Sequence, residues 1–387
     1  MDINIYKLMH KNDKVGNIML SDDDKFLINV KIENPELAPF LGNATVENMR
    51  NWWNNRSIPG TRKDLNIILE NAQCKNAGEL MAKNLALSLS DCYWISPIEV
   101  NLSWQEVNLY KEHFTNKLNI YRDKYTPNPT LSGQMDKYWI TENEKNYLIK
   151  KSEIAYGQQN INELVATKLH EVQNFNNHVK YETILKDGKC IGSKSEAYTN
   201  ENIESISAYQ VIQSKKISND MSFYEGLIRI CAENGLNEKE VRKFLDYETM
   251  SDLWIGNTDR HLMNIEILRD SNTLKFIGMA PIFDTGNSLY WDISRTLTKK
   301  EHIGQKINSF ASTSGKSLKY VKNKEIFNMS KVLTPDNIYN IFKENGVPEG
   351  RIDEILKNHE TRHKLLENFI EGEKIWENGL KKDEFCR

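Results

Sequence analysis

Hydrophobic and polar positions follow two different periods along this chain, and the period changes several times. Segments in which apolar residues recur every three or four positions predict helices, whereas short apolar runs between turn residues predict strands. Residues 1 to about 45 carry short apolar runs and Asp-rich, Gly-containing turns, so we expect a few strands there. Helices are expected at 45–54, 77–89 and 103–121, the last opened by a capping box. The first 125 residues are therefore predicted to be mostly helical.

The pattern changes after Thr126, where Pro127 and Pro129 mark a linker. The elements expected beyond it are strands at 135–140 and 147–151, a helix at 161–172, a hairpin within 179–193, helices at 201–212, 221–234 and 238–255, a second hairpin within 265–277, and a helical end from 335 to about 378. Strands with one helix, followed by a helical body, predict an α+β fold with two lobes. The predicted domains are an accessory region at 1–125, a small β-rich lobe at 126–200 and a helical lobe at 201–387.

Composition narrows the class of protein. Charged residues make up 27% of the 387 positions and aromatic residues 10%, which is typical of an ordinary globular chain. The formal net charge of -3 and the pI of about 6.3 argue against a dedicated nucleic-acid binder. Five scattered cysteines without a CxxC pair fit a reducing cytoplasm and indicate neither disulfides nor a cysteine zinc site. The N-terminus has no signal core, and no apolar run is long enough to span a membrane.

The strongest candidate chemistry lies in Asn257-Thr258-Asp259-Arg260-His261-Leu262-Met263-Asn264 and in Pro281-Ile282-Phe283-Asp284. Asp259 can orient a hydroxyl nucleophile and accept its proton. The amide oxygen of Asn264 and the carboxylate of Asp284 can hold Mg²⁺ against the phosphates of ATP. His261 can donate to a phosphate or brace the loop. The three side chains together predict a phosphoryl-transfer site.

Two further segments suit the nucleotide. The loop from Thr130 to Lys137 contains Ser132-Gly133, and a turn of small residues lets backbone N–H groups approach phosphate oxygens. Lys150 closes an apolar strand and can extend its ammonium toward the phosphates, and Glu163 on the next helix can pair with it. Taken singly, the loop could also be an ordinary polar turn, Lys150 a solvated strand end, and Glu163 part of a helix surface.

Together the motifs resemble those of the HipA-like serine/threonine kinases and their smaller CtkA-type relatives. The matching residues are Ser132-Gly133, Leu148-Ile149-Lys150, Asn257-x-Asp259-x-His261-x-x-Asn264 and Pro281-x-Phe283-Asp284, within about 125–330. The resemblance implies a two-lobed protein-kinase-like fold, with Asp259 as the catalytic aspartate. It further implies Mg²⁺ on Asn264 and Asp284, and nucleotide contacts from His261 and Lys150.

The resemblance also implies a protein substrate that carries serine or threonine. HipA-type kinases can phosphorylate a serine in their own glycine loop, which makes Ser132 the candidate site and Thr130 the fallback. The first 120 residues do not show that family's usual N-terminal domain, which disfavours a toxin that pairs with a DNA-binding antitoxin. This region is instead a place where a regulatory partner could bind.

Other interpretations stay open. A pseudokinase, or another nucleotide-binding interaction module, would share the same motifs. His359-Glu360-Thr361-Arg362-His363 matches the H-E-x-x-H pattern of zinc hydrolases, although charged neighbours indicate a solvated helix. A lipid kinase is a further alternative, because phosphoinositide kinases share the Asp-Arg-His-x-x-Asn order. Ser314-Gly315-Lys316-Ser317 is similar to the end of a P-loop, but Phe310 stands where glycine is required, so we expect a surface loop.

Overall fold

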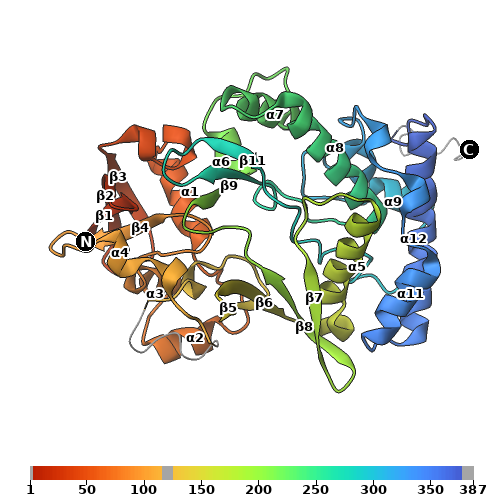
Figure 1. The fold of residues 1–387 in the computed structure, drawn as a ribbon, viewed down its shortest axis with the longest axis horizontal. Coiled ribbons are helices and arrows are strands. Elements are labelled where there is room, and N and C mark those ends of the chain that lie inside the picture. Colours follow the sequence, from red (N-terminus) through yellow and green to blue (C-terminus); the bar gives the residue numbers. More distant parts are fainter. Residues whose placement is uncertain (1–2, 116–124, 377–387) are drawn as a thin grey trace, which may run out of the picture. The chain divides into compact units, whose positions relative to one another are not determined.

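The computed structural model describes residues 3–115 and 125–376. It has a mixed α+β fold with several antiparallel sheets, as the sequence predicts, and the chain divides into two compact units (Figure 1). The first unit comprises Met1–Lys150, Glu196–Lys216 and Ile267–Ile277, and the second comprises Lys151–Ser195, Ile217–Glu266 and Gly278–Arg387. The two-lobed kinase layout stays a prediction.

The first unit begins with a four-stranded sheet in the order β3-β2-β1-β4. Its strands are β1 (Ile3–His10), β2 (Asp13–Ser21), β3 (Leu27–Ile32) and β4 (Tyr93–Pro97), and its helices are α1 (Val46–Arg56), α2 (Leu65–Ala72), α3 (Ala77–Lys83) and α4 (Trp104–Val107). Helix α1 packs against β3 and begins at the predicted N-cap Thr45, whose side chain accepts from the N–H of Asn48. Leu8, Ile18 and Trp53 are almost fully buried in the core that results.

The expectation that the first 125 residues are mostly helical is wrong, because the four strands of this sheet contain nearly as many residues as helices α1 to α4 do. Two predicted helices are also too long. Helix α3 ends at Lys83, since Leu85 and Ala86 take left-handed φ angles of 53° and 51° that no right-handed helix tolerates. Helix α4 keeps the predicted capping box but stops at Val107, and residues 116–121 of that prediction lie outside the described residues.

Further strands follow in the first unit. They are β5 (Asp136–Glu142), β6 (Lys145–Lys151), β9 (Ile203–Ser207), β10 (Glu266–Asp270) and β11 (Phe276–Met279), with helix α6 (Ala208–Gln213) after β9. The strands at 135–140 and 147–151 are confirmed, as is the hairpin within 265–277. The helix predicted at 201–212 is wrong in its first half. β9 is buried on both faces and includes the ion-paired Glu204, so it lacks the polar alternation that indicates a strand.

The second unit contains one hairpin and most of the helices. They are α5 (Gln158–Val172), β7 (Tyr181–Lys186), β8 (Lys189–Glu196), α7 (Phe223–Glu233), α8 (Glu238–Ile255), α9 (Lys299–Gly304), α10 (Ser314–Ser317), α11 (Pro335–Glu344) and α12 (Glu349–Ile370). Helices α8 and α12 lie side by side (Figure 1). Among the described helices, none joins the length to the apolar composition that crossing a membrane requires.

Candidate active site

The candidate catalytic loop starts where α8 ends. Gly256 takes a left-handed φ of 67° and turns the chain out of the helix, a conformation that glycine adopts without steric cost. The next residue, Asn257, anchors the loop in two directions. Its Nδ2 donates to Asp252 Oδ1 at 2.9 Å, and its Oδ1 accepts from the backbone N–H of Asp259 at 3.1 Å. The last turn of α8 therefore fixes the position of Asp259.

Of the two carboxylate oxygens of Asp259, one accepts a hydrogen bond from a described residue and the other does not. Asn287 Nδ2 donates to its Oδ2 at 2.8 Å, and the N–H of Thr258 donates to the carbonyl of Asn287 at 3.0 Å. Within the described residues, Oδ1 of Asp259 has no hydrogen-bond partner. A carboxylate with a fixed orientation and one oxygen that no described residue binds is suited to orient a hydroxyl group. The sequence did not identify Asn287, whose only sign is its place three residues after Asp284.

Asn264 is buried, and its amide has a defined orientation. Its Nδ2 donates to the backbone carbonyl of Asp259 at 3.0 Å, so its Oδ1 points the other way. No described residue donates to that oxygen. A carbonyl oxygen presented in this manner is a suitable ligand for a hard cation.

Arg260 joins the candidate catalytic loop to the segment that carries Asp284. One nitrogen, Nη1, donates to the carbonyl of Asn264 at 2.9 Å and to that of Phe283 at 2.6 Å. Its Nε donates to Oδ2 of Asp252 at 2.9 Å, and its Nη2 donates to Oδ1 of the same residue at 3.1 Å. A single buried guanidinium therefore brings Asp259, Asn264 and Asp284 into one region of the second unit, a role that the sequence did not indicate.

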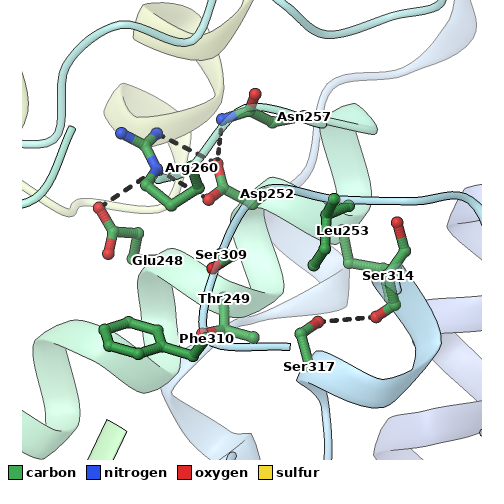
Figure 2. A pocket seen from close by; sticks show the side chains of 11 residues that line it. Glu248, Thr249, Asp252, Leu253, Asn257, Arg260, Ser309, Phe310, Ser314 and Ser317 are labelled. Carbon is green, nitrogen blue, oxygen red and sulfur yellow. Dashed lines mark hydrogen bonds and ion pairs between the residues drawn. The ribbon is translucent and has the colours of Figure 1, made fainter. Parts of the chain in front are cut away.

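The buried guanidinium of Arg260 forms ion pairs with the carboxylates of Asp252 and Glu248 (Figure 2). Burial alone would lower the pKa of Arg260, but the carboxylates of Asp252 and Glu248 hold it above its ordinary value. Burial raises the pKa of Glu248, which lies 3.5 Å from Arg260 Nε. The guanidinium stays charged, and it stabilises the loop through fixed bonds that do not depend on water.

Asp284 lies on strained backbone. Its φ of 54° is left-handed, which is uncommon for a residue with a side chain and often accompanies functional sites. Its N–H donates to Tyr181 Oη at 3.2 Å, and Ile282 pairs with the chain at 177–179. These bonds hold the segment on both sides of Phe283, so Asp284 is presented in a defined direction.

Helix α5 supports the turn that follows Asp284. Asn162 Nδ2 donates to the carbonyls of Gly286 and Ser288 at 2.9 and 2.6 Å, and Gln159 Nε2 donates to Asn287 Oδ1 at 2.7 Å. A Cβ added to Gly286 would lie 3.0 Å from the carbonyl of Gln159, a tight contact that favours glycine at this position. The sequence predicted the helix at 161–172 but not that it would position Asn287.

His261 braces its own loop. Its Nδ1 accepts from the N–H of Met263 at 3.2 Å, and its carbonyl accepts from the N–H of Asn264 at 2.7 Å. In a neutral imidazole this arrangement puts the proton on Nε2, which leaves that nitrogen able to donate. Of the two roles expected for His261, bracing is present, and donation to phosphate stays a prediction.

The predicted nucleotide loop lies in the first unit. Gly133 has a φ of 90°, which favours glycine, and Ser132 is exposed. In the described part of the chain, the backbone N–H groups of Ser132, Gly133 and Gln134 have no hydrogen-bond partner. Three consecutive donors of this kind suit an anion such as phosphate.

Lys150 and Glu163 are both almost fully buried. Lys150 lies near the end of β6, and Glu163 lies on α5, where its Oε2 accepts from Ser193 Oγ at 2.8 Å. They belong to different units, and their pairing stays a prediction.

The Ser314–Ser317 segment is not a surface loop as expected. It forms the short helix α10, in which Ser314, Gly315 and Ser317 are buried beside the pocket of Figure 2. A Cβ on Gly315 would come within 2.6 Å of the Ile303 side chain. Close packing against α9, not phosphate binding, accounts for the glycine.

The H-E-x-x-H segment is part of α12, and its histidines pack against α8. The ring of His359 is buried, with its centroid 4.2 Å from that of Trp254 in an edge-on arrangement. Trp254 Nε1 donates to His363 Nδ1 at 3.3 Å, and the two imidazole centroids are 6.5 Å apart. The solvated helix face expected here is therefore wrong for His359. The two rings join α8 to α12, a role that needs no zinc.

Replacing His359 with phenylalanine is expected to make the second unit more tolerant of acid. Burial lowers the pKa of His359 to about 3, with His363 and Arg362 adding to the effect, whereas an unfolded histidine titrates near 6.5. The unfolded chain therefore binds the extra proton first. Stability is present above pH ~6.5 and falls by up to about 1.4 kcal/mol per pH unit as the pH drops toward 3. Urea unfolding at pH 7, 6 and 5 measures the slope, and equal slopes for the two proteins would contradict this origin.

The fold and the site together define a mixed α+β protein with a candidate catalytic loop in its second unit. No protein-family model and no curated protein matches the chain. Among solved structures, it is similar to the Helicobacter pylori proinflammatory kinase CtkA, with a TM-score of 0.43, 16% identity, and coverage of 62% of this chain and 94% of that one.

It is also similar to HipA from a toxin–antitoxin system of Shewanella oneidensis MR-1, solved with HipB and operator DNA. Here the TM-score is 0.49 and the identity 12%, and the match covers 94% of this chain and 90% of the other. Both groups named from the motifs thus occur among the structural neighbours, which confirms the predicted resemblance. At these scores neither structure argues for a function, so the side chains must do so.

Proposed function

We propose that this chain is an ATP-dependent kinase that transfers the γ-phosphate to a serine or threonine hydroxyl of a protein. The observation that supports this most is the fork of Arg260, whose Nη1 contacts the carbonyls of Asn264 and Phe283. This fork brings the Asp259 loop next to Asp284. Phosphoryl transfer relies on such positioning and on fixed charges.

Each residue has a specific task in this proposal. Asp259 Oδ1 orients the acceptor hydroxyl and takes its proton, while Asn287 keeps Oδ2 in place. Asn264 Oδ1 and the carboxylate of Asp284 are the groups that would hold Mg²⁺, and oxygen ligands are those that Mg²⁺ prefers. ATP would supply the phosphoryl group, and the Mg²⁺ held by these residues would neutralise part of the charge that develops on it.

The phosphates would be held by donors from this chain. The N–H groups of Ser132, Gly133 and Gln134, which have no partner within residues 3–115 and 125–376, suit phosphate oxygens. Lys150 and His261 Nε2 are the proposed side-chain donors. Glu163 is proposed to orient Lys150.

For self-modification the loop offers one hydroxyl that is more available than the other. Thr130 Oγ1 already donates to the carbonyls of Leu87 and Pro127 at 2.9 and 2.8 Å. Ser132 is exposed, and its hydroxyl has no hydrogen-bond partner among the described residues. Ser132 is therefore the proposed autophosphorylation site, ahead of Thr130.

Incubation of the purified chain with γ-labelled ATP and Mg²⁺, alone and with a degenerate Ser/Thr peptide library, tests the proposal. Label in the peptides or in the chain supports the kinase, and mass spectrometry then identifies the modified residue. ATP binding without any transfer would favour the pseudokinase alternative instead. If the chain neither bound ATP nor transferred phosphate, the nucleotide site itself would be refuted.

Asp284→Asn is expected to raise the Mg²⁺ concentration needed for half-maximal activity by at least about tenfold, because a neutral amide binds a hard cation less strongly than a carboxylate. Asp292→Asn, which alters an exposed residue of the same segment, is the control. Initial rates at fixed ATP across a Mg²⁺ titration give the result. An unchanged midpoint in Asp284→Asn would remove this residue from the metal site.

A further inference from the structure

A buried arginine of the N-terminal region donates hydrogen bonds to the backbone of the predicted nucleotide loop. Arg62, between α1 and α2, is only 3% exposed. Its Nε and Nη2 donate to the carbonyl of Gly133 at 3.0 and 2.8 Å, and Nη2 also reaches the carbonyls of Leu131 and Ser132. Three consecutive carbonyls of the loop are thus turned toward one guanidinium, and all four residues belong to the first unit.

The direction of these carbonyls determines the direction of the loop's N–H groups. In a trans peptide, the C=O of one residue and the N–H of the next point in opposite directions, and no described peptide bond is cis. The N–H groups of Ser132, Gly133 and Gln134 therefore point away from Arg62. These are the same three donors that have no partner in the described part of the chain.

The shape of the loop depends on Arg62 because other anchors hold only its ends. At the entrance, Thr130 Oγ1 donates to the carbonyl of Leu87, and Asn128 Oδ1 accepts from the N–H of Trp139. The N–H of Leu131 still belongs to the entrance, because it donates to the carbonyl of Asn128 at 3.2 Å. Among the described residues, the carbonyls of Leu131, Ser132 and Gly133 accept hydrogen bonds from Arg62 alone. A planar fork that donates in several fixed directions suits this task, and a lysine ammonium could not reproduce it.

We propose that Arg62 is a positioning residue for nucleotide phosphate, through which the N-terminal region sets the affinity for ATP. This inference rests on the proposed function, because it takes the anion at the loop to be a phosphate of ATP. Arg62 acts through the carbonyls and does not itself touch the ligand. Orienting three N–H donors before the ligand arrives lowers the ordering cost of binding.

Arg62→Ala tests the proposal through two measurements on the full chain. The Kd and KM for ATP are expected to rise about tenfold, while kcat at saturating ATP changes less than about threefold, because the catalytic residues are intact. Amide hydrogen exchange of residues 131–136 is expected to become faster in the absence of ATP. Arg62→Lys should give an intermediate Kd, since it keeps the charge but not the fork.

Arg50→Ala is the matched control. Arg50 also clamps backbone, donating to the carbonyls of Leu27 and Ile28 at 3.0 and 2.9 Å in the same unit, but it does not contact the loop. Its ATP affinity and its exchange at 131–136 should equal those of the wild type. Similar losses in both arginine variants would show general destabilisation and overturn the proposal, as would an unchanged Kd in a folded Arg62→Ala chain.

The two levels of the proposal can fail separately. If the wild-type chain binds no ATP, the proposed function fails, and the nucleotide role of Arg62 fails with it. If the wild type binds ATP and transfers phosphate while Arg62→Ala keeps the same KM, only the role of Arg62 is refuted.

Discussion

Asp259→Asn is expected to lower the rate of phosphoryl transfer about 10³-fold, within the range found when a proton-accepting group is removed. The amide that replaces the carboxylate cannot accept the proton of the attacking hydroxyl. It can still accept the bond from Asn287 Nδ2 through its own carbonyl oxygen, so the loop keeps its anchor. The backbone bonds from Asp259 to Asn257 and Asn264 do not involve the changed atoms.

Single-turnover measurements with labelled ATP would give the rate of the chemical step. Thermal unfolding of the same sample would check that Asp259→Asn is folded. The control is Asp353→Asn, an exposed residue on α12 whose change should leave the rate within twofold of the wild type. A folded Asp259→Asn chain that retained a tenth or more of the rate would exclude Asp259 as the proton acceptor.

Arg260→Met is expected to have the largest effect on stability, a loss of about 3–5 kcal/mol in the free energy of unfolding. The methionine fills part of the space but leaves the buried carboxylate of Asp252 with the neutral donor Asn257 and no charged partner, with Glu248 beside it. It also removes the donor from the carbonyls of Asn264 and Phe283. Activity should fall as well, because Asp259 and Asp284 would no longer be held together.

Chemical denaturation of the wild type, of Arg260→Met and of Arg229→Ala would measure the difference. Arg229 forms an exposed ion pair with Glu233 on α7, at 2.9 Å, and such pairs contribute at most about 1 kcal/mol. The variant Arg229→Ala should therefore stay close to the wild type. A loss below about 1 kcal/mol in Arg260→Met would show that the buried charges are not balanced by this guanidinium.

Local patterns were most reliable where one element had clear ends. Helix α8 was predicted with its observed bounds, because Asn237 caps its first turn and Gly256 closes it. Local patterns failed in β9, where burial on both faces removes the alternation of polar and apolar residues. They also failed at Leu85 and Ala86, non-glycine residues whose φ angles are left-handed. Those angles depend on packing with residues distant in the sequence, so no local rule could anticipate them.

The candidate site shows the same division. Asp259, Asn264 and Asp284 were predicted from residue type and spacing, because the chemistry proposed for a metal-bound phosphate requires such side chains. The residues that position these side chains could not be predicted. Asn287 and Arg260 lie in or near the motifs, but their roles depend on the oxygen to which each one donates a hydrogen bond.

By itself, the sequence determined the α+β class and the order of most elements after Thr126, since short-range periodicity is enough for these, and it predicted a kind of chemistry from residue type. Only the tertiary structure decided that one buried guanidinium joins Asn264 to Phe283, and that Arg62 holds a loop about seventy positions further along the chain. The physical reason is that hydrogen bonds act over about 3 Å in space, whatever the separation along the chain. A sequence records that separation but not the distance.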